Sequence, residues 1–213
     1  MNLVNSNVLR ETFDHVPPGT LERLAELFER VDATYAQAAA QCGFECRGCE
    51  ESCCRTRFYH HTLVEMAYLK QGLAALSTAE KNRVVQRARA QIDKMRRCEA
   101  TGEPMRAMCP LNHDGRCGLY AQRPMICRLH GVAHLLRRGD GTAQQGPGCH
   151  LFSQQCLDPG EARLDRTLYY QQMAALEQSL RRALNFQGRI KLTVAEMVLL
   201  LCNGDDVEGE ALL

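Results

Sequence analysis

Residues 46–54 read CRGCEESCC and bring four cysteines within nine positions. Cys46 and Cys49 are separated by two residues, one of them a glycine, which is the spacing at which a tight turn presents two thiolates to one metal ion. Cys53 and Cys54 are harder to place on one ion, because consecutive side chains usually diverge. The stretch therefore predicts a thiolate metal site, and the adjacent pair indicates either two metals or one ligand with a supporting neighbour.

A second series of cysteines follows at wider spacing. Residues 109–128 read CPLNHDGRCGLYAQRPMICR. Asp114-Gly115 is a dipeptide typical of two-residue hairpin turns, so we expect it to fold Cys109 and Cys117 back beside each other. Two thiols would then meet across a loop that is too long for a simple metal knuckle.

Two further cysteines complete the candidate set. Cys127 is expected on a short helix after Pro124, and Cys149 lies in the glycine-rich sequence GPGCH. Around them, residues 103–156 are rich in glycine and proline and are predicted to form loops and short turns, which need metal cross-links for the order that packing cannot supply. The eight candidates, enough for two four-ligand sites, are Cys46, Cys49, Cys53, Cys54, Cys109, Cys117, Cys127 and Cys149.

Arginine accompanies both cysteine segments. Four thiolates around one Zn²⁺, or around a [4Fe–4S]²⁺ cluster, leave a charge of about −2 that nearby cations should compensate. We expect this role from the group Arg47, Arg55, Arg57, Arg116, Arg123 and Arg128. For any single one of them, an ordinary surface position is an equally good interpretation.

Outside the cysteines the chain is predicted to be mostly helical. Apolar residues recur three and four apart in 21–38, so a first helix should begin near Thr20, and a similar stripe occupies 169–184. Capping-box patterns predict three more helix starts, at Thr62–Glu65, Ser77–Glu80 and Thr193–Glu196. Gly72 is the expected end of the first of these helices. The predicted fold class is mainly α with a loop-rich, cysteine-ligated metal-binding core.

Length and charge set the outer bounds. With 213 residues the chain suits a single domain over 1–213, in which a cysteine-cluster metal-binding core in 42–156 lies between helical segments in 1–41 and 157–213. A formal net charge of +1 provides no strong field for nucleic acid, so no nucleic-acid partner is expected. No feature identifies a protein partner, which leaves the metal ion as the expected partner.

Apolar runs in the sequence are short. The longest, 197–202, has six residues against the roughly 20 needed to cross a bilayer, and residues 1–16 lack the apolar centre of a secretory signal. We therefore expect no membrane partner and a cytoplasmic location. In the reducing cytoplasm, many thiols indicate metal or redox chemistry more often than a disulfide framework.

The cysteine pattern as a whole resembles a known family. Its elements are CxxCxxxCC, then CPL, DGRCGLY and RPxxCR, then one later cysteine. This arrangement is similar to the YkgJ-type cysteine-cluster family, which is described as zinc- or iron-chelating. The resemblance implies the metal ligands Cys46, Cys49, Cys53 or Cys54, Cys109, Cys117, Cys127 and Cys149. Many members place two residues before the Cys-Cys pair where this chain has three, so the choice between Cys53 and Cys54 stays open.

Four cysteines fall outside the candidate set. Cys202, in an apolar segment, is expected to be a small core residue, and Cys98 is expected to end a helix. Cys42 and Cys156 lie near the cluster as spare ligands, although a role without metal is the stronger expectation for each.

Histidine is expected to play a minor part. His130 or His150 could substitute for a thiolate ligand. Because the thiols already suffice, an exposed or hydrogen-bonded side chain is the expectation for every histidine, including the pair His60-His61.

The spacing does not decide between zinc and iron, either as an ion or in an iron–sulfur cluster, and three classes of function remain open. A metal-binding module for structural, storage or sensing purposes needs nothing beyond the visible pattern. A redox enzyme, or a methyl-transfer enzyme of the flagellin lysine methylase type to which related domains are assigned, also needs an open coordination position or a substrate pocket. No glycine-rich nucleotide loop accompanies the cysteines. A metal-ordered adaptor would expose an apolar stripe on a helix in 161–185.

Overall fold

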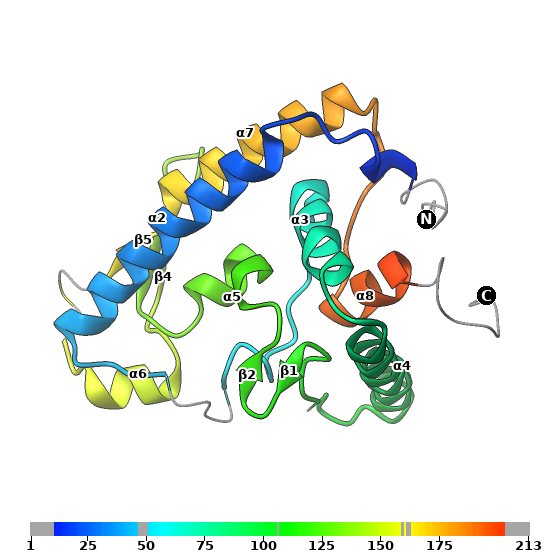
Figure 1. The fold of residues 1–213 in the computed structure, drawn as a ribbon. Helices are drawn as coiled ribbons and strands as arrows, with labels where there is room; N and C mark the ends of the chain where they lie inside the picture. The colour runs from blue at the N-terminus through cyan, green and yellow to red at the C-terminus, as the bar shows by residue number, and fades with distance from the viewer. Residues whose placement is uncertain (1–10, 47–50, 106, 159, 161–162, 203–213) are drawn as a thin grey trace.

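Helices account for most of the computed structural model, which describes residues 11–46, 51–105, 107–158, 160 and 163–202 (Figure 1). The predicted mainly α class is confirmed. The helices are α2 (Thr20–Gln41), α3 (Leu63–Ala74), α4 (Thr78–Thr101), the 3-10 turn η1 (Tyr120–Gln122), α5 (Met125–Leu129), α6 (His150–Gln155), α7 (Thr167–Ala183) and α8 (Val194–Cys202). The strands are β1 (Asn112–His113), β2 (Arg116–Cys117), β3 (His134–Arg137), β4 (Ala143–Gly146) and β5 (Leu164–Asp165). Of the helices described, none combines the length and the apolar character that a membrane crossing requires.

Helices α2 and α7 run alongside each other in opposite directions (Figure 1). Arg30 Nη2 donates to Gln172 Oε1 at 2.9 Å, and the hydroxyl groups of Thr34 and Tyr169 share a hydrogen bond. The residue numbers rise along one helix as they fall along the other, as an antiparallel pair requires. The pair covers one side of α3, which follows Cys53 and Cys54 in the chain, and of α5, which carries Cys127.

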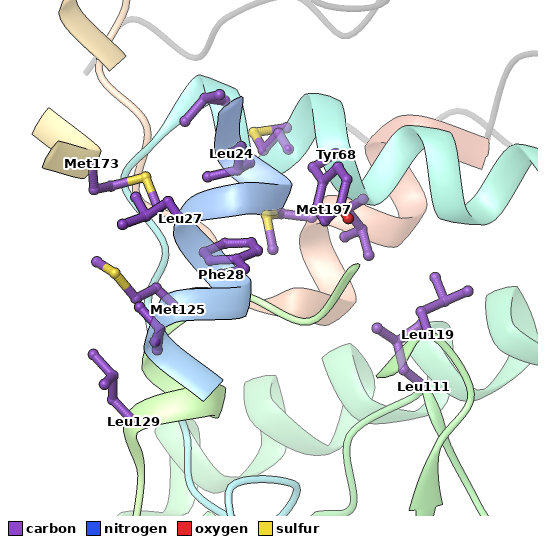
Figure 2. Packing of buried hydrophobic residues seen from close by; sticks show 14 of the residues in the cluster. Leu24, Leu27, Phe28, Tyr68, Leu111, Leu119, Met125, Leu129, Met173 and Met197 are labelled. Carbon is purple, nitrogen blue, oxygen red and sulfur yellow. The ribbon is translucent and has the colours of Figure 1, made fainter. Parts of the chain in front are cut away.

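One apolar core joins the helices. Figure 2 shows the side chains that they contribute: Leu24, Leu27 and Phe28 from α2, Tyr68 from α3, Met125 and Leu129 from α5, Met173 from α7 and Met197 from α8. The rings of Phe28 and Tyr68 lie 5.8 Å apart between centroids. The stripe predicted on α7 belongs to this core, since Met173 and Leu180 are buried. It is not the exposed surface that an adaptor would present.

Local sequence signals set several helix starts. Helix α2 begins at Thr20, as predicted. At α4 the capping box forms in full, with Ser77 N donating to Glu80 Oε2 at 2.9 Å and Glu80 N donating to Ser77 Oγ at 3.4 Å. Thr193 and Glu196 make the equivalent pair of bonds at α8. These reciprocal bonds satisfy backbone groups that a helix terminus otherwise leaves open.

Helix α3 begins where predicted but is capped in another way. Thr62 makes no side-chain cap, and the first two backbone N–H groups of the helix donate to the buried carboxylate of Glu177 at 2.9 and 3.0 Å. The carboxylate of Glu65, predicted to complete a capping box, accepts hydrogen bonds from the Thr62 hydroxyl at 2.5 Å and from Met125 N at 2.8 Å. The capping-box prediction at this helix is therefore wrong, because two long-range carboxylate contacts replace it.

Gly72 does not end α3, which continues to Ala74. A Cβ atom at this position would lie 2.9 Å from the side chain of Gln122 in η1. The glycine therefore permits a close approach of two elements, and the prediction of a helix end at this residue is wrong.

The predicted hairpin is present in the cysteine region. Strands β1 and β2 pair antiparallel, with Asn112 opposite Cys117. The two turn residues Asp114 and Gly115 have positive φ angles of 50° and 81°, as the favoured two-residue turn requires. The rest of 103–156 is not only loop, because α5, α6 and strands β3 and β4 form within it.

Candidate thiol-lined metal site

Cysteines from three segments of the chain line one cavity of about 50 Å³. They are Cys53 and Cys54 before α3, Cys109 and Cys117 at the hairpin, and Cys127 on α5. All five are unpaired thiols. Apolar side chains such as Met95 and Leu111 form further parts of the wall. One ordered water needs about 10–15 Å³ of cavity volume, so the space suits an ion or a few waters and not a large substrate.

Backbone hydrogen bonds bring the first two segments together. Cys109 N donates to Cys54 O at 2.7 Å, and Asn112 N donates to Cys109 O at 3.0 Å as the chain turns into the hairpin. The hairpin then returns Cys117 opposite Asn112. The turn predicted to fold Cys109 and Cys117 back beside each other is present, and both cysteines line the cavity.

Ion pairs hold α5, and with it Cys127, against α2. The carboxylate of Asp32 accepts hydrogen bonds from Arg123 Nη2 at 2.8 Å and Arg128 Nη1 at 2.5 Å. Both guanidinium side chains are nearly buried, with exposed fractions of 10% and 3%. The Arg128 guanidinium also lies over the ring of Phe28, 4.1 Å from its centroid. These two arginines therefore anchor the element that carries Cys127.

The arginines predicted to compensate thiolate charge differ in their surroundings. Arg57 lines the cavity and pairs with Glu99 at 3.0 Å, and Arg55 also lines the cavity. Arg116 is exposed on β2. Arg47 lies outside the described residues. Arg57, Arg123 and Arg128 thus pair with carboxylates, which reduces the positive charge left to balance bound thiolates.

Replacing Asp32 with alanine should lower the free energy of unfolding by about 2 kcal/mol, because it leaves two buried guanidinium groups without their carboxylate. We place the effect below that of a fully buried pair because the Asp32 side chain is 35% exposed. Urea denaturation followed by circular dichroism measures the change. Asp93→Ala, at an exposed position of α4, is the matched control and should stay within about 0.5 kcal/mol of the parent. Equal losses in the two variants would contradict the anchoring role.

Burial and mutual repulsion set the acidity of the cavity thiols. Burial raises the pKa of Cys109 to about 12 and also raises the pKa values of Cys117 and Cys127, in each case with a further contribution from neighbouring cysteines. The hydrogen bond between Cys53 and Cys54 lowers the pKa of Cys54 to about 6 and, together with burial, raises that of Cys53. A bound cation would oppose the repulsion, since thiolates and not thiols are metal ligands.

A second group of cysteines lies near Tyr35 of α2. Burial raises the pKa of the Tyr35 hydroxyl, and Cys46, Cys149 and Cys53 raise it further. Cys127 in turn raises the pKa of Cys53. Cys53 therefore lines the cavity and also interacts electrostatically with Tyr35, whereas the backbone of Cys54 is joined to the hairpin.

The three predicted ligands that do not line the cavity differ in their surroundings. Cys46 is exposed, and Cys149 is buried at the N-cap of α6, where its sulfur accepts a hydrogen bond from Phe152 N at 3.4 Å. Gly148, which precedes it, has a φ of 88°, in keeping with the special backbone expected for the GPGCH loop. Cys49 lies outside the described residues.

The cavity thiols lie near one another, but their sulfur atoms are not arranged around a common centre that could hold a metal ion. Within the described ranges, no group of three or more histidine, cysteine, aspartate or glutamate side chains is placed so as to hold a metal ion. The chemistry of the cavity donors fits zinc or iron, for which thiolate is a preferred ligand. Binding would need side-chain rearrangement to bring the sulfur atoms to a common centre.

Cys42 and Cys156 form a disulfide, with their Cα atoms 5.2 Å apart. The bond joins the end of α2 to the end of α6, beside the edge-to-face contact of the Phe44 and Phe152 rings. Each sulfur is bonded to the other, so in the disulfide neither is available as the spare metal ligand that the sequence left as the minor alternative. Cys98 is buried in the last turn of α4.

Two polar side chains of the cavity wall, those of His60 and Gln91, are not predicted from the sequence to be site residues. The expectation for His60 is an exposed or hydrogen-bonded side chain, whereas the residue is buried and its Nε2 has no partner among the described residues. His60 is 3% exposed, and Gln91 projects from α4. Neither carries a spacing signal, because each lies far along the chain from most of the cysteines. The histidines considered as substitute ligands are elsewhere: the ring of His130 contacts Glu51 O, and His150 is exposed.

No protein-family model, curated protein or solved structure matches the chain. The resemblance to the YkgJ-type family stays a prediction that rests on the cysteine pattern alone.

Proposed function

We propose that this chain is a metal-binding protein that chelates zinc or iron through the thiols of its cavity. The observation that carries the proposal is the meeting around one cavity of five cysteines that form no disulfide bond, contributed by the segment before α3, the hairpin and α5. A lone buried cysteine such as Cys98 is adequately explained as a small core residue. Five thiols around one cavity are not explained in this way, because alanine or valine would fill the space without burying five ionisable groups next to one another.

The arrangement supports two sets of ligands. One set draws its thiolates from Cys54, Cys109, Cys117 and Cys127. Cys54 contributes to the raised pKa values of the other three, and its backbone carbonyl accepts a hydrogen bond from Cys109 N. The other set consists of Cys46, Cys53 and Cys149 near Tyr35, with Cys49 assigned from its spacing. This division gives each member of the Cys53–Cys54 pair a separate metal.

A redox or methyl-transfer enzyme with an iron–sulfur centre is the second candidate. A larger open groove, of about 650 Å³, borders the cavity and shares Cys109 and Gln91 with it. Arg55, Arg87 and Lys94 line this groove and give it a basic character. Such a groove favours an enzyme because a substrate could approach the thiols through it.

Zinc titration tests the proposal. The reduced, metal-free, full-length chain, competing with a chromophoric chelator, should take up about one or two zinc ions with a binding free energy of about 10 kcal/mol or more. The same chain with its thiols alkylated in denaturant and then refolded is the control. If the unmodified chain takes up no zinc, and reconstitution with iron and sulfide also gives no bound iron, the proposal fails.

A further inference from the structure

His60 is held firmly in the wall of the thiol-lined cavity. Its backbone forms an antiparallel bridge with Leu192, in which His60 N donates to Leu192 O at 2.7 Å and Leu192 N donates to His60 O at 3.0 Å. The residue is 3% exposed and lines the same cavity as the five cysteines. Its position is therefore set by the link between the cysteine segment and the chain entering α8.

The imidazole has an unsatisfied nitrogen. Nε2 of His60 is buried and finds no hydrogen-bond partner among the described residues. The same holds for Oε1 of Gln91, another residue of this wall. A buried polar atom without a partner costs about 1–3 kcal/mol, so two of them beside one cavity point to a polar occupant.

The imidazole is also in the right form to bind a cation. Burial lowers the pKa of His60 to about 4, with a further contribution from His61, so the ring is neutral near pH 7. A neutral ring presents a lone pair, whereas a protonated ring cannot coordinate a metal. Water could satisfy Nε2 alone, whereas a metal ion would accept the lone pair of Nε2 and would also bind the cavity sulfurs as thiolates.

We propose that His60 supplies a nitrogen ligand to the metal bound by the cavity thiols, so that this site has mixed sulfur and nitrogen ligation. The inference rests on the proposed metal-binding function and deepens it.

Charge at the cavity supports this ligand set. Four thiolates on Zn²⁺ leave a charge of about −2, and exchange of one thiolate for a neutral imidazole leaves about −1. Two of the arginines on the wall already pair with carboxylates, Arg57 with Glu99 and Arg123 with Asp32. Because these ion pairs leave little positive charge on the wall to balance the metal site, a site charge of about −1 fits the cavity better than one of about −2.

The neighbouring histidine gives a matched control. His61 Nδ1 lies 3.0 Å from Ile190 O, and His61 is absent from the cavity wall. Substitutions at 60 and 61 thus make the same chemical change in the same segment, inside and outside the proposed site.

Zinc K-edge X-ray absorption of the reduced, zinc-loaded full chain tests the inference. The parent should show sulfur at about 2.3 Å, nitrogen at about 2.0–2.1 Å and the outer-shell scattering of an imidazole ring, which water does not give. His60→Ala should lose the imidazole signal and bind zinc at least about tenfold more weakly. His60→Cys should regain tight binding with sulfur alone, and His61→Ala should match the parent.

The outcomes separate the inference from the function on which it rests. A parent that binds zinc without imidazole scattering, or a His60→Ala chain that keeps that scattering, overturns the role of His60 and leaves thiolate binding intact. A parent that takes up neither zinc nor iron overturns the proposed function itself. Circular dichroism verifies folding. If His60→Ala does not fold, the X-ray absorption spectrum of His60→Cys tests the inference instead: loss of the imidazole scattering supports the role of His60, and its retention overturns that role.

Discussion

Cys127→Ser should lose about one metal equivalent per chain and melt about 10 °C lower than the metal-loaded parent. Cys127 is the cavity thiol carried by α5, and serine cannot replace a thiolate as a ligand for zinc or iron. The thermal shift follows from mass action, since a ligand present at about 1,000 times its dissociation constant stabilises by about 4 kcal/mol. Elemental analysis and calorimetry on the same samples measure both quantities.

Cys98→Ser is the control for this substitution. Cys98 is also buried, but it lies in α4 and is not among the residues that line the cavity. It should lose some stability through the buried hydroxyl and keep its full metal content. If Cys127→Ser retains as much metal as Cys98→Ser, Cys127 is not a ligand and the assignment of the cavity set fails.

Cys42→Ser should lower the free energy of unfolding of the oxidised, metal-free chain by roughly 4–5 kcal/mol. The disulfide closes a loop between residues 114 positions apart, and loops of that length restrict the unfolded chain strongly. Guanidinium denaturation with and without reductant measures the effect. Metal uptake by the reduced chain should be unchanged, because neither partner lines the cavity.

The parent under reducing conditions provides the comparison for this variant. Added reductant should bring its unfolding midpoint to that of Cys42→Ser and should leave the variant where it was. Cys156→Ser, which removes the other half of the bond, should behave like Cys42→Ser. A parent whose midpoint does not respond to reductant would contradict the stabilising role of the bond.

Features encoded by neighbouring residues could be predicted from the sequence. The start of α2 at Thr20, the capping box of Ser77 and Glu80 and the turn at Asp114-Gly115 all appear as expected. Each depends on hydrogen bonds or backbone angles within a few residues. Local pattern alone is sufficient in these cases.

Features made by distant residues could not be predicted. Glu177 caps α3 from a position 114 residues away along the chain, and no spacing rule connects the two. Asp32 likewise pairs with Arg123 and Arg128 only because α2 packs against α5. Burial of His60 follows from its bridge to Leu192, which the local sequence does not show.

The candidate site shows the same division. Spacing predicted that Cys109 and Cys117 would meet, and the hairpin brings both to the cavity. Spacing left Cys53 and Cys54 indistinguishable, whereas the structure joins Cys54 to Cys109 through a backbone bond. Metal binding by these thiols stays a prediction.

Metal content per chain, determined by elemental analysis with a visible absorption spectrum on protein purified without air, tests the central claim most directly. The account predicts zinc at about one or two per chain in a colourless solution, or iron with acid-labile sulfide and broad absorption near about 400 nm. Protein that contains neither metal, and that acquires neither after reduction and incubation with zinc or with iron and sulfide, would contradict it.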